Sequence, residues 1–324
     1  KADVSNPGPI TQAGLVGDVE IVRTLLRAGA SVNAASRGDD PGATALITAA
    51  QNGYAEVVAV MIANGAELDT STTDPEKGGA TALCKAATNG HEHVVRMLLS
   101  AQADSNVRKR DGFTALNLAS ERGNLEIVCA LLDAGASVDL GTMQKNQTPL
   151  HTAASAGHLQ IVRELLQHSA SVHELHNTGD RTSPLISACF QSDASVVQAL
   201  IDANAPLDHA KIDGWTPLLI SISQGHDGVA LALIDAGASL SQLDARGDEG
   251  DGSPSIILAS TPLVRASQMG RVEIVRRLLH APGVQVDASC NSGLTPLLCA
   301  ATYGQVEVLR ILLHAAADVE ARNE

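Results

Sequence analysis

The chain has 324 residues, 44% of them hydrophobic, but only one Trp, two Tyr and two Phe. A thick globular core of this length normally needs more aromatic bulk, so the composition favours thin layers of closely packed aliphatic helices. A net charge of −14 opposes binding to nucleic acid and to anionic membranes, and no window approaches the roughly 18 apolar residues of a membrane span. The start of the chain carries no signal-peptide pattern.

The chain has five cysteines, an odd number, and no two of them have C-x-x-C spacing. This pattern indicates neither a disulfide framework nor a zinc site. We therefore expect a protein of a reducing, intracellular compartment, the cytoplasm, that holds no metal.

A short signal recurs along the chain: Thr or Ser, then Pro or Ala, then Leu. After a degenerate copy at Gly8-Pro9-Ile10, it begins at residues 44, 81, 114, 148, 183, 216, 261 and 295. Successive spacings are 37, 33, 34, 35, 33, 45 and 34 residues, which is a period near 33 with two insertions. The chain therefore contains nine copies of one structural unit.

Each copy is predicted to begin with a short helix. Thr or Ser is a favoured helix N-cap, and Pro fits the first helical position because its missing N–H would have no partner there. The helix passes through an Ala pair such as Ala153-Ala154, whose small side chains let neighbouring helices approach closely. It then ends at a glycine, which can adopt the left-handed cap conformation. These glycines are Gly17, Gly53, Gly90, Gly123, Gly157, Gly225, Gly270 and Gly304.

A second helix is predicted in each copy from apolar residues spaced along one face. The first copy has Ile21, Val22, Leu25 and Leu26, and the same pattern returns at 127–132 and 274–279. One helical hairpin cannot bury such faces alone, so each copy must pack on the next in a one-dimensional stack.

The stretch T-P-L-H-T-A-A-S-A-G-H-L-Q-I-V-R-E-L-L, from Thr148 to Leu166, closely resembles the ankyrin repeat. The match spans essentially the whole chain. It implies an all-α ankyrin-repeat solenoid of about nine helix-turn-helix repeats, in which the turns between repeats project as β-hairpin fingers. In this family the first helices line a concave face, and that face and the finger tips usually bind partners.

The ends of the chain suggest that residues 1–324 form a single array cut from a longer one. Lys1 to Asn6 reads like the tail of a previous copy, and Ala321 to Glu324 stops inside what should be another finger. Two departures from the pattern predict that the sixth and seventh copies are the softest. Ser192 replaces a helix-ending glycine, and Gly228 falls inside a second helix, where it costs about 0.5–1 kcal/mol relative to Ala.

The rare aromatic residues are the first candidates for partner binding. Phe113 and Trp215 occupy the same variable finger position, and Phe190 and Tyr303 lie just before the ends of first helices. By the family resemblance all four face the binding surface, where aromatic side chains are typical anchors. The alternative is that each finger ring packs on the adjacent finger.

A basic finger tip, Arg108-Lys109-Arg110, is the second candidate in this acidic chain. It is either a solvated turn or a contact for an acidic segment of a partner. Nucleic acid is disfavoured because no basic stripe extends along the array.

The two insertions are interpreted differently. Thr70 to Ala80 is a polar surface loop. The longer insertion, Ser241 to Ser260, lacks the spacing of a calcium loop and contains Ile256-Ile257-Leu258. These three residues either fold back onto their own helices or offer an apolar patch to a partner.

No enzyme motif is present. The chain lacks G-x-x-x-x-G-K-[ST], G-x-G-x-x-G and G-x-S-x-G, so we expect no catalysis and no cofactor. His91, His151, His158 and His226 occupy positions at which the family uses His structurally. Cys290, in a finger, is expected to be the only exposed cysteine.

The main functional hypothesis is therefore a scaffold or adaptor that binds a partner protein through the concave face and finger tips. The alternative is an architectural subunit or spacer built permanently into a multiprotein assembly, or a regulatory arm of a larger multidomain protein. Neither a nucleic-acid partner nor direct membrane insertion is expected.

Overall fold

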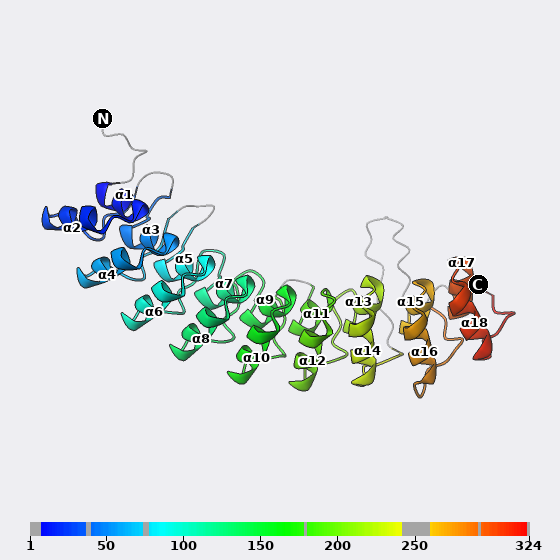
Figure 1. Ribbon diagram of the computed structural model, residues 1–324. Helices are drawn as coiled ribbons and strands as arrows, with labels where there is room; N and C mark the ends of the chain where they lie inside the picture. Colours follow the sequence, from blue (N-terminus) through cyan, green and yellow to red (C-terminus); the bar gives the residue numbers. More distant parts are fainter. Residues whose placement is uncertain are drawn as a thin grey trace. The chain divides into compact units, whose positions relative to one another are not determined.

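The computed structural model describes residues 8–36, 40–73, 78–177, 180–241, 260–290 and 293–322 (Figure 1). These ranges contain 18 α-helices and no β-strand, which confirms the all-α prediction. The helices belong to two compact units. Unit 1 is Lys1–Ala153 with Arg163–Ala170, and unit 2 is Ala154–Val162 with Ser171–Glu324.

Unit 1 is built from four helical hairpins, each made of a first and a second helix. Each first helix packs on the next first helix, and each second helix on the next second helix. The first helices are α1 (Pro9–Val16), α3 (Ala45–Asn52), α5 (Ala82–Asn89) and α7 (Ala115–Arg122), and the second helices are α2 (Val19–Arg27), α4 (Ala55–Ala63), α6 (Glu92–Ser100) and α8 (Leu125–Asp133).

Unit 2 repeats the same arrangement. Its first helices are α11 (Pro184–Cys189), α13 (Pro217–Gln224), α15 (Pro262–Gln268) and α17 (Pro296–Thr302), and its second helices are α12 (Ala194–Asp202), α14 (Asp227–Asp235), α16 (Val272–His280) and α18 (Val306–His314). The remaining hairpin, α9 (Pro149–Ala156) and α10 (Leu159–Gln167), contributes residues to both units.

The predicted starts of the first helices are confirmed to the residue. All nine begin one position after the start of the recurring signal. From the second copy on, the Thr or Ser hydroxyl accepts a hydrogen bond of 3.2–3.4 Å from the main-chain N–H three residues later, which satisfies one donor of the first turn. The glycines predicted at the helix ends have φ between 68° and 81°.

The apolar face of the second helices forms the core within each unit. Ile127 and Val128 of α8, and Ile274 and Val275 of α16, are all buried. Ile21 of α2 was expected to be buried in the same way, but 48% of it is exposed. The reason is positional, because α2 contacts α1 and α4 but no preceding second helix among the described residues.

Two kinds of hydrogen bond recur between successive hairpins. In the first, the side chain after a helix-ending glycine contacts a carbonyl of the preceding first helix, as when His91 Nε2 lies 3.0 Å from Gln51 O and His226 Nδ1 lies 3.1 Å from Cys189 O. In the second, an Asn or Asp in a loop accepts an N–H from the next copy. These acceptors are Asn33, Asp69, Asn106, Asp208 and Asp287. The structural role predicted for His91 and His226 is therefore confirmed.

The fingers are tight hairpin turns that are too short to count as strands. Lys109 N–H donates to Phe113 O at 2.8 Å, and Lys211 N–H donates to Trp215 O at 3.0 Å. Among the described residues, the only antiparallel bridge pairs Ala35 with Thr44. None of the described helices combines the length and apolar character that crossing a membrane requires.

Candidate partner-binding surface

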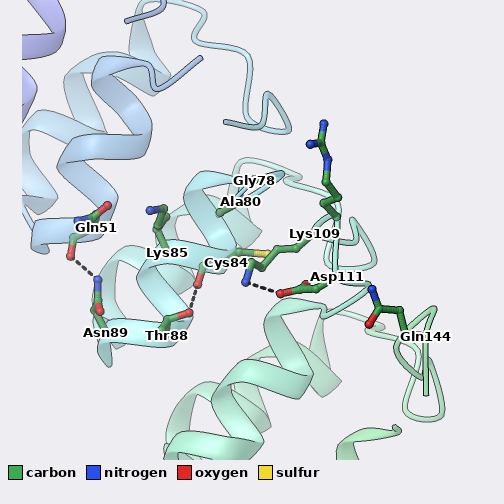
Figure 2. Close-up of a pocket in the computed structure, with 11 residues that line it drawn as sticks. Gln51, Gly78, Ala80, Cys84, Lys85, Thr88, Asn89, Lys109, Asp111 and Gln144 are labelled. Carbon is green, nitrogen blue, oxygen red and sulfur yellow. Dashed lines mark hydrogen bonds and ion pairs between the residues drawn. The ribbon is translucent and has the colours of Figure 1, made fainter. Parts of the chain in front are cut away.

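A hollow of about 540 Å³ lies in unit 1 beside the finger formed by residues 108–113, which we call the Lys109 finger (Figure 2). Among the described residues, its lining comes from two first helices, α3 and α5, and from finger loops. We call it the Lys109 hollow. It is lined by Gln51, Gly78, Ala80, Cys84, Lys85, Thr88, Asn89, Lys109, Arg110, Asp111 and Gln144.

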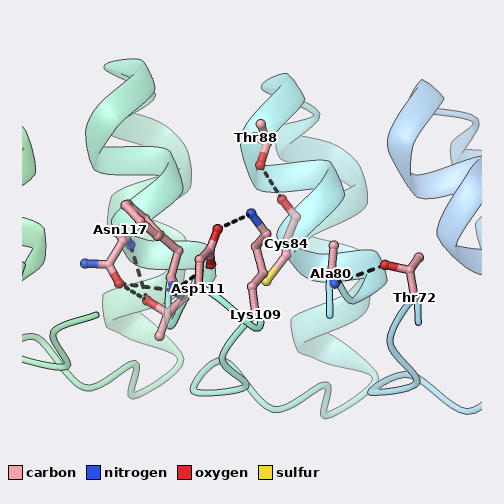
Figure 3. A network of polar contacts seen from close by, with 9 residues as sticks. Thr72, Ala80, Cys84, Thr88, Lys109, Asp111 and Asn117 are labelled. Carbon is pink, nitrogen blue, oxygen red and sulfur yellow. Dashed lines mark hydrogen bonds and ion pairs between the residues drawn. The ribbon is translucent and has the colours of Figure 1, made fainter. Parts of the chain in front are cut away.

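Lys109 is held in a defined position by its own finger. Its ammonium lies 3.0 Å from Asp111 Oδ2, and only 19% of its side chain is exposed. Asp111 also accepts the N–H of Phe113 at 3.2 Å, so one carboxylate orders both the lysine and the turn. Figure 3 shows the lysine side chain lying across Cys84 toward Asp111.

The floor of the hollow is formed by α5. Cys84 is buried, and Thr88 Oγ1 donates to Cys84 O at 2.8 Å. Burial raises the pKa of the Cys84 thiol, against the smaller lowering effects of hydrogen bonds with Thr81 and of the Lys109 charge. The thiol therefore stays protonated near neutral pH and serves as an apolar floor rather than a nucleophile.

Neighbouring loops are tied together around the hollow. Arg110 N–H donates to Gly78 O at 3.2 Å, which joins the Lys109 finger to the loop before α5. Asn117 Nδ2 donates to Gln147 O at 3.1 Å, and Asn117 also caps its own helix at Thr114. At the end of α5, Asn89 Nδ2 donates to Gln51 O at 2.8 Å. The walls are thus set by hydrogen bonds between copies.

The hollow is a basic spot on an acidic chain. Of the described residues, Lys85, Lys109 and Arg110 line it, together with one carboxylate, that of Asp111. Of the predicted basic finger tip, Lys109 and Arg110 line the hollow, whereas Arg108 is half-buried in the same finger and does not. Lys85 was not among the predicted site residues. Its position in a first helix, the layer expected to bind partners, could have indicated it.

The four candidate aromatic residues fall into two groups. Phe113 and Trp215 are half-buried in their fingers, and the Arg265 guanidinium of α15 lies 5.2 Å from the Trp215 ring centroid. This cation–π contact ties Trp215 to the next copy, although to its first helix and not to the adjacent finger that the packing alternative named. Phe190 and Tyr303 cap α11 and α17 and are 45% and 54% exposed.

The prediction that Cys290 is exposed is wrong. Cys290 is buried in a cluster with Val264 and Cys299, and its N–H donates to Leu294 O at 3.0 Å to close the finger. The finger turns the Cys290 side chain inward, and the local sequence does not indicate this orientation. Cys129 is the one cysteine that is not buried, and none of the five, all of which are described, forms a disulfide. Ile256, Ile257 and Leu258 lie outside the described residues.

Metal chemistry has no evident site in the described ranges, because they contain no group of three or more His, Cys, Asp or Glu placed to hold an ion. His151 is buried and lies 2.8 Å, through Nδ1, from Thr148 Oγ1, which matches the structural role predicted for it.

Comparison with known proteins identifies the family. The ankyrin-repeat profile matches residues 42–73, and the profile of ankyrin repeats in three copies matches 69–142, 102–174, 138–209, 170–244 and 248–323. These matches cover well over half of the chain, so it belongs to the ankyrin-repeat family. Ankyrin repeats generally mediate protein–protein interaction, and the fold is typically non-catalytic.

Individual relatives share only the repeats. The chain is 30% identical over 213 residues to the putative palmitoyltransferase ZDHHC13 of Danio rerio, covering 65% of this chain and 32% of that protein. It is 32% identical over 110 residues to the human ankyrin repeat and SOCS box protein 16, covering 34% of this chain and 23% of that one. The chain thus spans a third or less of these relatives.

A solved structure with the same fold is the crystal structure of the human ASB11 ankyrin repeat domain. The two align with a TM-score of 0.60 and 25% sequence identity, and the alignment covers 72% of this chain and 99% of that one.

Proposed function

We propose that this chain is a scaffold or adaptor module that binds a partner protein through its finger tips and its first-helix layer. The observation that carries the proposal is the Lys109 hollow, because its lining comes entirely from fingers and first helices. A recess bounded by ordered polar groups, with apolar side chains beneath, is the usual form of a specific contact site.

In unit 2, exposed aromatic residues support the proposal that the first-helix layer binds the partner. Phe190 and Tyr303 cap first helices and leave about half of each ring in solvent. Rings at such positions add apolar contact area at little cost in side-chain entropy and often dominate binding energy. A reducing, cytoplasmic location is part of the proposal, in keeping with five cysteines that form no disulfide.

The second candidate is an architectural role through the second-helix layer. A groove between α16 and α18 is lined by Leu279 and Ile311 together with Arg276 and Arg310, and Leu313 of α18 is exposed. A permanent contact on this side would bury that apolar surface. The same groove is ordinary packing between neighbouring helices, so the first-helix layer remains the better candidate.

Site-specific photo-crosslinking in an extract of the source cells separates the two roles. A benzophenone amino acid is placed at Phe190 or Tyr303 in one set of variants, and at Ile21 or Leu313 in the matched set on second helices. All four side chains are exposed, so the replacements leave the fold intact. We expect one partner protein to be crosslinked from the first set only. Crosslinks from the second set alone would support the architectural role instead.

A further inference from the structure

We propose that the Lys109 hollow binds an acidic peptide segment of the partner protein, with its Asp or Glu carboxylates paired to Lys85, Lys109 and Arg110. This inference rests on the proposed function and names the chemistry of one contact within it. It concerns unit 1 alone.

The charge of the hollow opposes that of the chain as a whole. The described residues that line it include three cationic side chains and one carboxylate, in a protein whose formal net charge is −14. A distant acidic surface does not prevent an acidic segment from binding there, because charges more than about 8–10 Å apart are largely screened at physiological salt. The local sign of the hollow therefore decides which segment it attracts.

The carboxylates that now neutralise the lysines are easily replaced. Asp111 pairs with Lys109 at 3.0 Å, and Asp40 lies 3.6 Å from Lys85. The side chain of Asp111 is 48% exposed and that of Asp40 is 38% exposed. Because both carboxylates are open to solvent, a carboxylate from a bound peptide can reach the lysines and take their place.

The lysines are also preorganised, because they are more buried than the carboxylates they pair with. The Lys109 and Lys85 side chains are 19% and 24% exposed; Lys85 belongs to α5, and Lys109 lies beside Cys84 of the same helix (Figure 2). A lysine already held by packing loses little rotamer freedom on binding, and this removes a cost of about 0.5–1.5 kcal/mol per side chain. Charge-assisted contacts to such a lysine are favoured over contacts to a mobile surface lysine.

The neutral groups of the hollow suit a peptide better than a nucleic acid. Gln51 and Asn89 lie toward one end and Gln144 toward the other (Figure 2), so amide groups flank the charged centre. Side-chain amides can pair with a peptide main chain on either side of an acidic residue. Among the described residues, the lining contains no aromatic side chain on which a base could stack, which is how unpaired nucleic acid is usually held.

The test uses the full chain and a short fluorescein-labelled peptide of alternating Glu and Gly, followed by fluorescence polarisation. A peptide with Gln in place of Glu is the charge control. We expect the Glu peptide to bind, the Gln peptide to bind at least about tenfold more weakly, and added salt to weaken binding of the Glu peptide. Equal binding of both peptides would overturn the inference, as would displacement of the Glu peptide by an equal concentration of polyuridylate.

Variants locate the contact. Lys109→Gln and Arg110→Gln should each weaken binding of the Glu peptide about threefold to tenfold, and the Lys85→Gln, Lys109→Gln pair by more than tenfold. Arg96→Gln is the matched control, because it makes the same charge change on α6, away from the hollow, and should bind like the parent. Arg110 is exposed, so its variant tests the site even where a lysine variant is unstable. Equal loss in Arg96→Gln would mean that only net charge matters.

The peptide-binding test can fail or succeed independently of the crosslinking test of the proposed function. If crosslinking at Phe190 and Tyr303 still captures a partner while the Glu peptide fails to bind, the interaction role stands and only the acidic-segment inference fails. If the Glu peptide binds at the Lys109 hollow and no partner is crosslinked from the first-helix layer, the site chemistry stands and the adaptor role fails.

Discussion

Gly112 lies near the end of the Lys109 finger, where Thr142 and Met143 of the next loop approach it closely. Its φ is +87°, a conformation that L side chains rarely adopt, and a Cβ there would overlap Met143 N. Gly135 has a similar φ of +81°, but no other atom lies within 4 Å of the corresponding Cβ position. The two glycines therefore share the backbone requirement and differ only in the close contact.

We predict that Gly112→Ala destabilises the chain much more than Gly135→Ala. Gly135→Ala should cost about 1–2 kcal/mol for the left-handed backbone alone. Gly112→Ala should cost about 1–3 kcal/mol more, because the new methyl group pushes two loops apart. Urea unfolding of both variants, followed by circular dichroism, measures the difference. Equal costs would mean that the contact between the loops contributes nothing.

For single residues, the sequence predicts those features that depend on neighbours along the chain. Thr114 and its equivalents were placed as N-caps because capping involves residues three apart in the chain. The burial of Cys290 and the ring contact of Trp215, in contrast, depend on residues of other elements. The inward turn of Cys290 and the cation–π contact of Trp215 with Arg265 join different copies, and the repeat pattern alone does not encode such pairings.

The helices of the sixth and seventh copies differ from the rest in ways that the sequence predicted. Helix α11 has only six residues and ends at a right-handed Phe190, where most first helices end at a left-handed glycine. Gly228 is the second residue of α14, and a Cβ there would meet only Ala194 Cβ, at 3.9 Å. The shortened helix loses main-chain hydrogen bonds, and the glycine loses conformational entropy on folding.

We predict that amide hydrogen exchange is faster in α11, α12 and α14 than in α7 and α8 of unit 1. Gly228→Ala should slow exchange in α14 and stabilise the chain by about 0.5–1 kcal/mol, because the site accepts a methyl group without strain. Mass-resolved exchange on the parent and this variant provides the measurement. Protection in α11 and α14 equal to that in α7 and α8 would show that these copies are not soft.

Element boundaries were therefore predictable where a cap residue marks them, and burial was less so. Ile21 has the same sequence context as Ile127 and Ile274, yet it alone of these three is exposed, and it lies on α2, which contacts no preceding second helix among the described residues. Only some of the residues that line the Lys109 hollow were predicted as site residues. Its finger stood out as a basic run, whereas Gln51, Lys85 and Asn89 are ordinary helix residues until the fold brings them to one place.

At the scale of the whole molecule, the regular period predicts one continuous array, and this remains a prediction. In such an array each repeat is stabilised by its neighbours, so a defect in one part lowers the stability of the rest. Trp215 is the only Trp of the chain and belongs to unit 2, so its fluorescence reports the unfolding of that unit alone.

We predict that Leu98→Ala, in α6 of unit 1, lowers the urea midpoint of the Trp215 signal together with that of circular dichroism. Leu98 is fully buried, so its truncation should cost about 2–5 kcal/mol. Leu15→Ala in α1 is the matched control, since Leu15 is 46% exposed and its loss should move neither midpoint appreciably. If the Trp215 midpoint stays at the parent value while the dichroism transition splits in two, the units unfold independently. The partner surface proposed on fingers and first helices would then consist of two separately folding parts, and each contact site would depend only on the stability of its own unit.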